Sequence, residues 1–212
     1  GMGSIFEEMG RTLTPSPLFS TGVLGATLIT LGGDDEQKQN YLPRIVDGSL
    51  TTALALEEGN RHSPFSISTK ATKAGNEYKI SGEKTFVIDG HCSNLIIVAA
   101  RTEGTDDDAS GITLFLVEAD TDGIEITKTS MVDSRNSANI KFNDIAVSSS
   151  NLLGEENNGA AILEEVLDRA QIAISAEMLG NASQAFDVTL NYLKERKQFG
   201  SVIGTFQALQ HR

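Results

Sequence analysis

The side chains best suited to acid–base or metal chemistry are scattered along this 212-residue sequence. The three histidines, His62, His91 and His211, lie far apart, and none has a second ligand at the spacing of a zinc site. Serine, histidine and aspartate are all present, but no nucleophile elbow carries the serine. Three successive aspartates at 106–108 lack the spaced oxygen ligands of a calcium loop and are typical of a solvated turn. These patterns predict neither a metal site nor a Ser–His–Asp hydrolase.

Nucleotide-binding glycine motifs are also absent from the sequence. No G-x-G-x-x-G follows a strand pattern, and there is no Walker A sequence. The formal net charge of −12 argues against nucleic acid or an anionic membrane surface as a partner. One cysteine, Cys92, cannot form an internal disulfide, and no apolar run approaches the roughly 18 residues of a membrane span. We therefore expect a cytoplasmic protein without a membrane segment.

The elements that must position any site fall into three regions of different hydrophobic period. Residues 3–48 have a helical pattern, with Asp34, Asp35 and Glu36 at the start of one helix. Between residues 51 and 147 the period drops to two, in short segments about ten residues apart. The expected strands are Thr51–Leu56, Ile67–Thr72, Glu77–Ser81, Thr85–Ile88, Leu95–Ala100, Ile112–Val117, Ile124–Thr129 and Ala138–Phe142.

The third region begins at Asn157, where a 3.6-residue period returns and holds for about 38 residues. This long apolar face needs other helices to cover it, and we expect the natural protein to continue beyond Arg212. The predicted fold class is α+β. It combines a partial N-terminal helical domain (1–48), a central antiparallel β-barrel or sandwich (49–153) and the first helices of a C-terminal helical bundle (154–212).

Four segments carry a resemblance to a known family. They match its patterns E-E-L/M-G-R, Y-L-P-x-I/L-x-x-G, G-x-K-x-[WF]-[IV]-[TX]-[ND]-G and Y-x-x-x-R-x-Q-F-G-x-x-I-x-x-F-Q, in that order along the chain. The matching segments are Phe6–Arg11, Tyr41–Gly48, Ser81–Gly90 and Tyr192–Gln207. On these segments the chain resembles the acyl-CoA dehydrogenase family, in a form truncated at both ends.

The resemblance implies a flavoprotein that binds FAD and acts in fatty acid and lipid metabolism. Family members oxidise an acyl-CoA thioester between its α and β carbons, with a carboxylate as base and flavin N5 as hydride acceptor. A dimer or tetramer of this chain, or a homologous partner subunit, is implied, as is an electron-transferring flavoprotein as electron acceptor.

On the two flavin strands the resemblance implies contacts from Leu56, His62, Phe86 and Ile88. Leu56 and Ile88 replace threonines, and His62 replaces a serine that faces the FAD pyrophosphate. Phe86 holds the aromatic position that packs on the flavin ring. Two alternatives remain open: His62 and Arg61 are simply exposed loop residues, and Phe86 is an ordinary core residue of a strand.

Three further cofactor residues, Arg196, Phe199 and Gln207, match positions that reach the FAD of a neighbouring subunit. A guanidinium suits a diphosphate by its charge and its forked donors. Lys194, Arg196 and Lys197 also offset the macrodipole at the end of a helix, which is the alternative explanation of their charge.

Substrate contacts are implied for Leu167, Asp168 and Gln171 on the long helix, with packing as the alternative role of Leu167. Some members carry the catalytic base at the position of Ala170, and alanine cannot accept a proton. The resemblance therefore implies a base beyond Arg212, in a Glu-Gly pair, and no catalytic residue within the sequence.

Two further functions stay open beside the dehydrogenase. The joint departure of Leu56, His62 and Ile88 from the family pattern suggests a non-catalytic or half-site subunit of a heteromeric dehydrogenase. Acyl-CoA binding or oxygen-dependent chemistry on the same scaffold is the third, because a fold does not fix a function.

Overall fold

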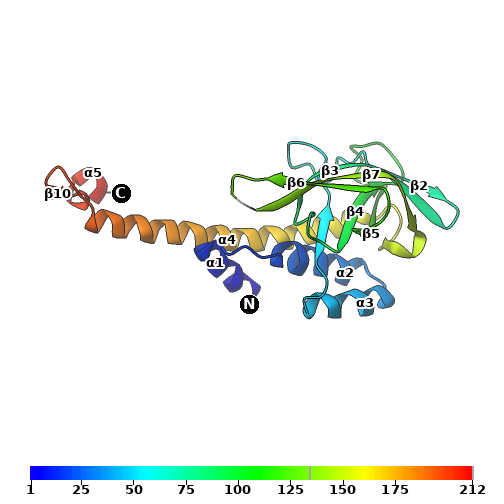
Figure 1. Cartoon of the computed structure of the whole chain (residues 1–212), viewed down its shortest axis with the longest axis horizontal. Helices are drawn as coiled ribbons and strands as arrows, with labels where there is room; N and C mark the ends of the chain where they lie inside the picture. Colours follow the sequence, from blue (N-terminus) through cyan, green and yellow to red (C-terminus); the bar gives the residue numbers. More distant parts are fainter. Residues whose placement is uncertain (134, 212) are drawn as a thin grey trace. The chain divides into compact units, whose positions relative to one another are not determined.

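Figure 1 shows a computed structural model of the chain, which describes residues 1–133 and 135–211. Contacts divide the chain into two compact units. One unit is Ser16–Ala170, and the other combines Gly1–Pro15 with the chain from Gln171 onward. The long helix α4, Gly159–Glu195, contributes residues to both.

The unit Ser16–Ala170 is built on one eight-stranded sheet. Its hydrogen-bonded path runs β6-β7-β3-β2-β4-β5-β8, with β1 added beside β4. β1 and β2 pair parallel to β4, and the other neighbours are antiparallel. The strands are β1 Thr52–Ala55, β2 Lys70–Ala74, β3 Glu77–Ile88, β4 Leu95–Arg101, β5 Ile112–Glu118, β6 Ile124–Ser130, β7 Asn136–Ser148 and β8 Leu152–Leu153.

The predicted α+β class is confirmed, but the sheet differs from a purely antiparallel barrel or sandwich. Its path ends at β6 and β8 without closing, and β1 and β2 both run parallel to β4, from which β3 separates them in the sequence. The two predicted strands Glu77–Ser81 and Thr85–Ile88 are one strand, β3, with two register shifts against β7.

The core of this unit lies along the central strands. β4 is buried at every residue and β5 at all but its last, as expected of strands that are covered on both faces. Tyr78 of β3 packs on Phe115 of β5 with the ring centroids 5.0 Å apart. A turn of 3₁₀-helix, η2 Ser149–Asn151, leads from β7 into β8.

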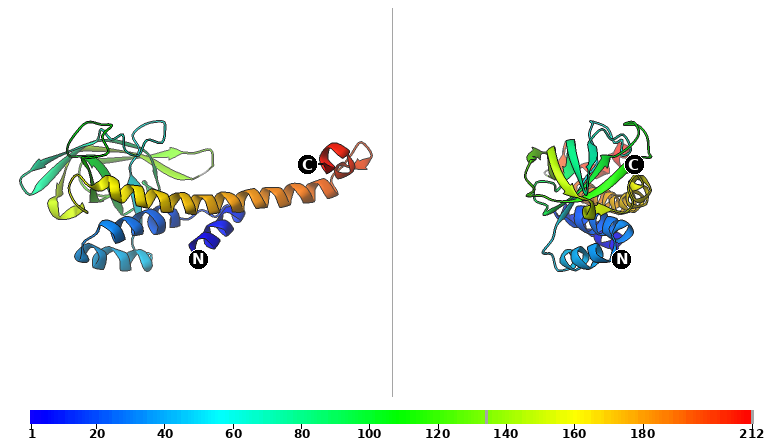
Figure 2. Two further views of the ribbon diagram at one scale, coloured as in Figure 1. Left: turned by 180° about the vertical axis from the view of Figure 1, so that it is seen from behind. Right: turned by 90° about the vertical axis from the view of Figure 1, so that its right-hand side faces the viewer.

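Three helical segments precede the sheet: the π-helix η1 Leu18–Gly25, α2 Ala26–Gly32 and α3 Asp35–Val46. Both views of Figure 2 show them on one side of the sheet. The predicted start of α3 is confirmed by a capping box, in which Asp34 accepts from the Gln37 N–H and the Gln37 side chain accepts from the Asp34 N–H.

The second unit pairs α1, Met2–Thr12, with the later part of α4. The two backbones approach closely at glycines: a Cβ on Gly10 would lie 2.0 Å from the Glu177 carbonyl oxygen, and one on Gly180 would lie 1.8 Å from that of Glu7. Arg11 donates to Asp187 at 3.1 Å beside this crossing. The predicted helix of about 38 residues is confirmed at 37.

The chain ends in short elements, β9 Lys197–Gln198, β10 Ser201–Val202, the 3₁₀ turn η3 Ile203–Thr205 and α5 Gln207–Gln210. Within residues 1–133 and 135–211, no helix has both the length and the apolar content to cross a bilayer.

Candidate functional site

The backbone of β3 is bulged at the position of Phe86. Lys84 pairs with Ile140 and Val87 with Ala138, so two residues of β3 oppose the single Asn139 of β7. Phe86 has a left-handed φ of +51°, and its N–H points to the Asn139 side-chain oxygen at 3.4 Å. A bulge of this kind re-aims side chains along a strand.

The bulge turns Phe86 outward. In a regular strand Phe86 would share the face of Lys84, two residues before it, and would point into the core. Instead Lys84 and Val87 are buried, whereas Phe86 is 46% exposed and Ile88 is 37% exposed. The alternative that Phe86 is an ordinary core residue is therefore wrong. Phe86 and Ile88 offer an apolar surface on the outer side of β3.

The chain leaving β1 is fixed against β3 next to this surface. The side chain of Leu56 is buried, and its carbonyl oxygen accepts from Lys84 Nζ at 3.0 Å. The N–H of Thr85 donates to the Glu57 carbonyl oxygen at 2.7 Å, and its hydroxyl donates to that of Gly59 at 3.2 Å. The two strands that the family pattern assigns to the flavin are thus joined at residues 56–59.

A buried ion pair lies under this junction. Lys84 Nζ is 2.7 Å from Glu58 Oε1, and the side chains are 0% and 12% exposed. Glu58 also accepts from the Ser68 N–H at 2.7 Å, the Ser68 hydroxyl at 2.5 Å and the Thr69 N–H at 2.9 Å. Burial raises the pKa of Glu58, but the Lys84 charge and these donors outweigh it and lower the pKa to about 2. Burial also lowers the pKa of Lys84 to about 8, against the pull of Glu58.

His62 belongs to the same loop and is held by Glu57. His62 Nδ1 lies 2.6 Å from Glu57 Oε1, and the other oxygen of Glu57 accepts from the Ser63 N–H at 3.0 Å. The His62 side chain is 67% exposed. An open pocket of about 440 Å³ lies here, lined by Glu57, Glu58, Gly59, Asn60, Arg61, Ser63, Ser66 and Ser68.

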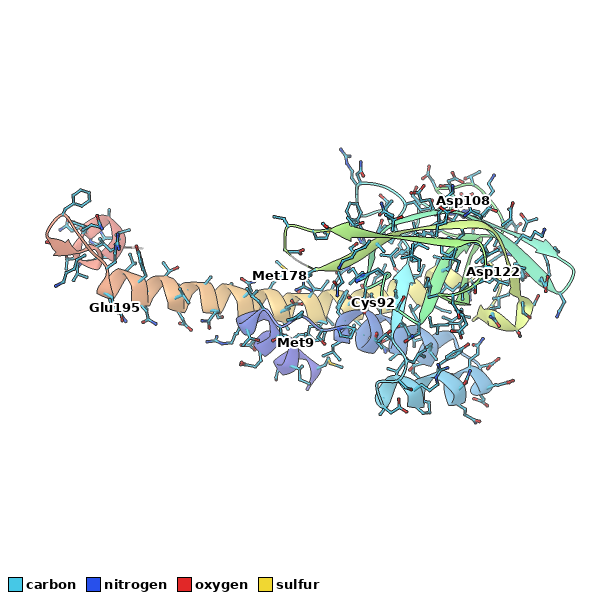
Figure 3. All side chains as sticks on the ribbon, in the orientation of Figure 1. Met9, Cys92, Asp108, Asp122, Met178 and Glu195 are labelled. Atoms are coloured by element: carbon cyan, nitrogen blue, oxygen red, sulfur yellow. The ribbon has the colours of Figure 1, made fainter. Side chains whose placement is uncertain are left out.

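Arg101, at the end of β4, fixes the far side of the loop. Its backbone N–H donates to the Thr69 carbonyl oxygen at 2.7 Å, and its guanidinium donates to the carbonyl oxygens of Ile67, Asp106 and Asp108 at 3.0, 2.9 and 2.8 Å. Figure 3 labels Asp108 in the connection between β4 and β5. Arg101 is 5% exposed and its donors are occupied, so it supports the loop from the interior of the protein.

The three residues predicted to reach a neighbouring FAD lie close together in sequence after α4, whose last residue, Glu195, is labelled in Figure 3. Arg196 accepts at its carbonyl oxygen from the Ile203 N–H at 2.9 Å, which closes the hairpin of β9 and β10. Phe199 and Gly200 form its two-residue turn with φ of +52° and +78°. Phe199 is 93% exposed, and Gln207 is exposed at the start of α5.

The predicted substrate residues share one stretch of α4. Leu167 is half-buried, while Asp168 and Gln171 are exposed. Ala170 is 4% exposed. Among residues 1–133 and 135–211, no group of three or more His, Cys, Asp or Glu residues is placed to hold a metal ion.

Comparison with protein families gives three successive matches. The acyl-CoA dehydrogenase N-terminal domain matches residues 2–49, the middle domain 53–145 and the C-terminal domain 157–212. The chain belongs to the acyl-CoA dehydrogenase family. The middle-domain match contains β3 and all of β1 except Thr52.

Two relatives of this acyl-CoA dehydrogenase family chain show how much of a full-length protein it spans. It is 36% identical to a probable acyl-CoA dehydrogenase, YngJ, of Bacillus subtilis over 97% of this chain and 56% of the relative. It is also 36% identical to the mitochondrial isovaleryl-CoA dehydrogenase of Pongo abelii, over 84% of this chain and 43% of the relative. The chain spans about half the length of the curated relatives it matches.

Solved structures agree with the fold. An acyl-CoA dehydrogenase from Geobacillus kaustophilus matches 99% of this chain and 57% of its own, with 33% identity and a TM-score of 0.90. A structure named as the FAD complex of PigA matches 99% of this chain and 57% of its own, with 26% identity and a TM-score of 0.88. An electron-transferring flavoprotein of Acidaminococcus fermentans covers 99% of this chain and 56% of its own, with 32% identity and a TM-score of 0.85.

Family members are FAD flavoproteins, and the residues of this family member fit that cofactor. A flat ring system needs an exposed apolar surface, which the bulge creates at Phe86 and Ile88. A diphosphate needs cations and donors, and the adjoining pocket offers Arg61 and the Ser63 hydroxyl, with His62 between them in the sequence. The carboxylates of Glu57 and Glu58 in the same pocket are occupied by donors of the chain itself.

Sequence patterns alone did not identify the residues that hold this site in place, which are Glu57, Glu58, Lys84, Thr85 and Asn139. One feature of the sequence could have identified Lys84. In a regular strand Lys84, Phe86 and Ile88 lie on the same face, and a lysine on an apolar face is unusual.

Proposed function

We propose that the whole protein is an FAD-dependent acyl-CoA dehydrogenase. The observation that supports this most is the bulge of β3, which exposes Phe86 and Ile88 at the strand position where the family places its flavin. Bound FAD supplies the acceptor for the hydride that leaves the β carbon of the acyl-CoA thioester. We retain the domain division 1–48, 49–153 and 154–212 as part of this proposal.

The residues of the sheet unit bind and orient the cofactor in this proposal. Phe86 and Ile88 cover one face of the ring system and exclude water from it. Leu56 has no hydroxyl to offer, so the strand contributes there through its fixed main chain. His62, held by Glu57, and Arg61 face the pyrophosphate from the loop.

Arg196, Phe199 and Gln207 serve the FAD of a neighbouring subunit. All three are exposed on the segment after α4, with Gln207 at the start of α5, and Phe199 is almost free of neighbours within its own chain. A second copy that covers this hairpin completes the site, and we propose a dimer or tetramer. An electron-transferring flavoprotein receives the electrons.

Leu167, Asp168 and Gln171 contact the acyl-CoA along α4. The catalytic base comes from a segment of the full-length protein outside residues 1–212, because Ala170 has no proton acceptor. In the complete active site that carboxylate removes the α-proton of the thioester.

The test uses the full-length product of the source gene. Purified protein is expected to carry the visible absorption of FAD, and that absorption is expected to bleach under anaerobic addition of butyryl-CoA, isovaleryl-CoA or another short or branched acyl-CoA. Reoxidation is then followed with an electron-transferring flavoprotein. A homo-oligomer that stays colourless after incubation with excess FAD would contradict the proposal. If colour appeared only with a homologous partner chain, the half-site subunit would be the better assignment.

A further inference from the structure

Lys84 is an unusual residue for the interior of a sheet. Its side chain is 0% exposed, and its partner on β7, Ile140, is a buried apolar residue. Lysine is almost never fully buried without a partner, since removing an ammonium from water costs several kcal/mol. The partner is Glu58, two residues after Leu56 in the segment that corresponds to the flavin pattern.

The ion pair joins three segments at one point. Lys84 comes from β3, Glu58 from the chain after β1, and the Ser68 and Thr69 groups that donate to Glu58 come from the entry to β2. Four donors, the Lys84 ammonium, two backbone N–H groups and a hydroxyl, saturate the two carboxylate oxygens. The pair therefore fixes the distances between these three segments as well as the position of β3.

The same pair lies immediately before the bulge. Lys84 donates to the Leu56 carbonyl oxygen, Thr85 donates to those of Glu57 and Gly59, and Phe86 follows in its left-handed conformation. One buried contact thus fixes the positions of both the main chain at residues 56–59 and the aromatic surface of Phe86. A buried pair is a weak source of stability compared with apolar residues of similar volume, so a role in fixing geometry accounts for it better.

We propose that the Lys84–Glu58 pair is a positioning couple for the cofactor, which sets the separation between the residue 56–59 main chain and Phe86 so that the flavin ring fits against both. Neither side chain touches the ring: Lys84 is fully buried and Glu58 is surrounded by its donors. This inference rests on the proposed function, because it concerns how the FAD of that function is held.

The test compares the double variant Lys84→Met/Glu58→Gln with wild type in the full-length protein. This variant removes both charges together, so neither is stranded, and glutamine keeps an oxygen for the Thr69 N–H. We expect the dissociation constant for FAD, measured by flavin fluorescence on the apoprotein, to rise about tenfold, with a changed visible spectrum of the bound flavin. Lys79→Met removes a lysine from an exposed position of the same strand and is expected to change neither value.

A double-mutant cycle with Phe86 separates positioning from general loosening. Phe86→Leu is expected to weaken FAD binding about tenfold in wild type and less than about threefold in the charge-free background, because the ring is then already misplaced. Strictly additive effects, or wild-type FAD affinity and spectrum in the double variant, would overturn the proposal. If the double variant does not fold, Glu58→Asp provides the same comparison, because it keeps the charge of the pair and shortens the side chain by one methylene group. It is expected to weaken FAD binding about threefold, and wild-type affinity would overturn the proposal.

The two proposals fail in different ways. If wild-type protein takes up no FAD, the proposed function fails and the positioning couple falls with it. If wild type binds FAD and the charge-free variant binds it equally well at an unchanged melting temperature, the positioning couple alone is wrong.

Discussion

Phe86 and Phe199 are both aromatic residues in the left-handed backbone region, with φ of +51° and +52°, and both stand at flavin positions of the family pattern. Their surroundings differ. Phe86 follows two residues that together donate to the carbonyl oxygens of Leu56, Glu57 and Gly59. Phe199 stands in a two-residue turn, with 93% of its surface exposed.

The difference shows two ways of presenting an aromatic ring. At Phe86 the chain itself supplies the support, so the surface exists before any ligand arrives. At Phe199 only the turn is fixed, because Gly200 with φ of +78° completes a hairpin turn that needs left-handed residues. The ring has little to pack against in its own chain, and a role for it needs a second molecule.

Removing the support at Phe86 should have the largest effect on stability. Glu58→Leu leaves the fully buried Lys84 without its counter-charge, and we expect a loss of about 4 kcal/mol in the free energy of unfolding. Denaturant unfolding of the full-length protein measures it, with Glu83→Leu, an exposed glutamate of the same strand, as the matched control. A loss below about 1 kcal/mol would show that the pair is not buried in solution.

Acid should weaken the same support without any substitution. The pKa of Glu58 falls from an ordinary 4.5 to about 2 on folding, so its contribution is complete above pH 4.5 and is lost as the pH falls toward 2. The shift corresponds to at most about 3 kcal/mol. Unfolding free energies at several pH values in that window should fall more steeply for wild type than for Lys84→Met/Glu58→Gln. Equal slopes would argue against the ion pair.

Phe199→Ala tests the role of the aromatic ring that its own chain does not support. Since the ring is exposed, the stability of the chain should change by less than about 0.5 kcal/mol. FAD affinity of the assembled protein should nevertheless fall about tenfold, as expected when a stacking partner is removed. Val46→Ala, at another apolar side chain with 87% exposure, should leave both quantities unchanged. Unchanged FAD affinity in Phe199→Ala would remove this residue from the proposed site.

The smallest effect is expected at the loop. His62→Ala should weaken FAD binding about threefold by equilibrium titration, because it removes one exposed donor that only Glu57 orients. Lys70→Ala, an exposed cation on β2, is the control. If the two substitutions had the same effect, general surface charge would explain the loss.

Much of the fold follows from local patterns that the sequence displays. The capping box at Asp34 and Gln37 starts α3 where the acidic cluster predicted it, and β4 and β5 coincide with predicted strands to within one residue at their ends. The parallel entry of β1 and β2 beside β4 could not be predicted, because strand order depends on long-range pairing and not on hydrophobic period.

The candidate site was predictable only where a family motif covers it. Phe86 and Arg196 came from such motifs, whereas composition alone left Phe86 as a core residue. Lys84 and Glu58 were missed because their significance arises from a contact over 26 residues, which neither segment reveals by itself. Leu167 and Gln171 remain predictions that the geometry of α4 neither supports nor contradicts.

The extra residue in the bulge of β3 also determines which side chains of the strand point into the core and which point outward. One extra residue in β7 beside Asn139 would give Thr85 and Phe86 a partner each and would restore strict alternation with Lys84 in β3. The aromatic ring would then enter the interior, and Val87 would take its place outside. The number of residues that face each other at the bulge thus decides whether Phe86 lies on the surface of this sheet or in its core.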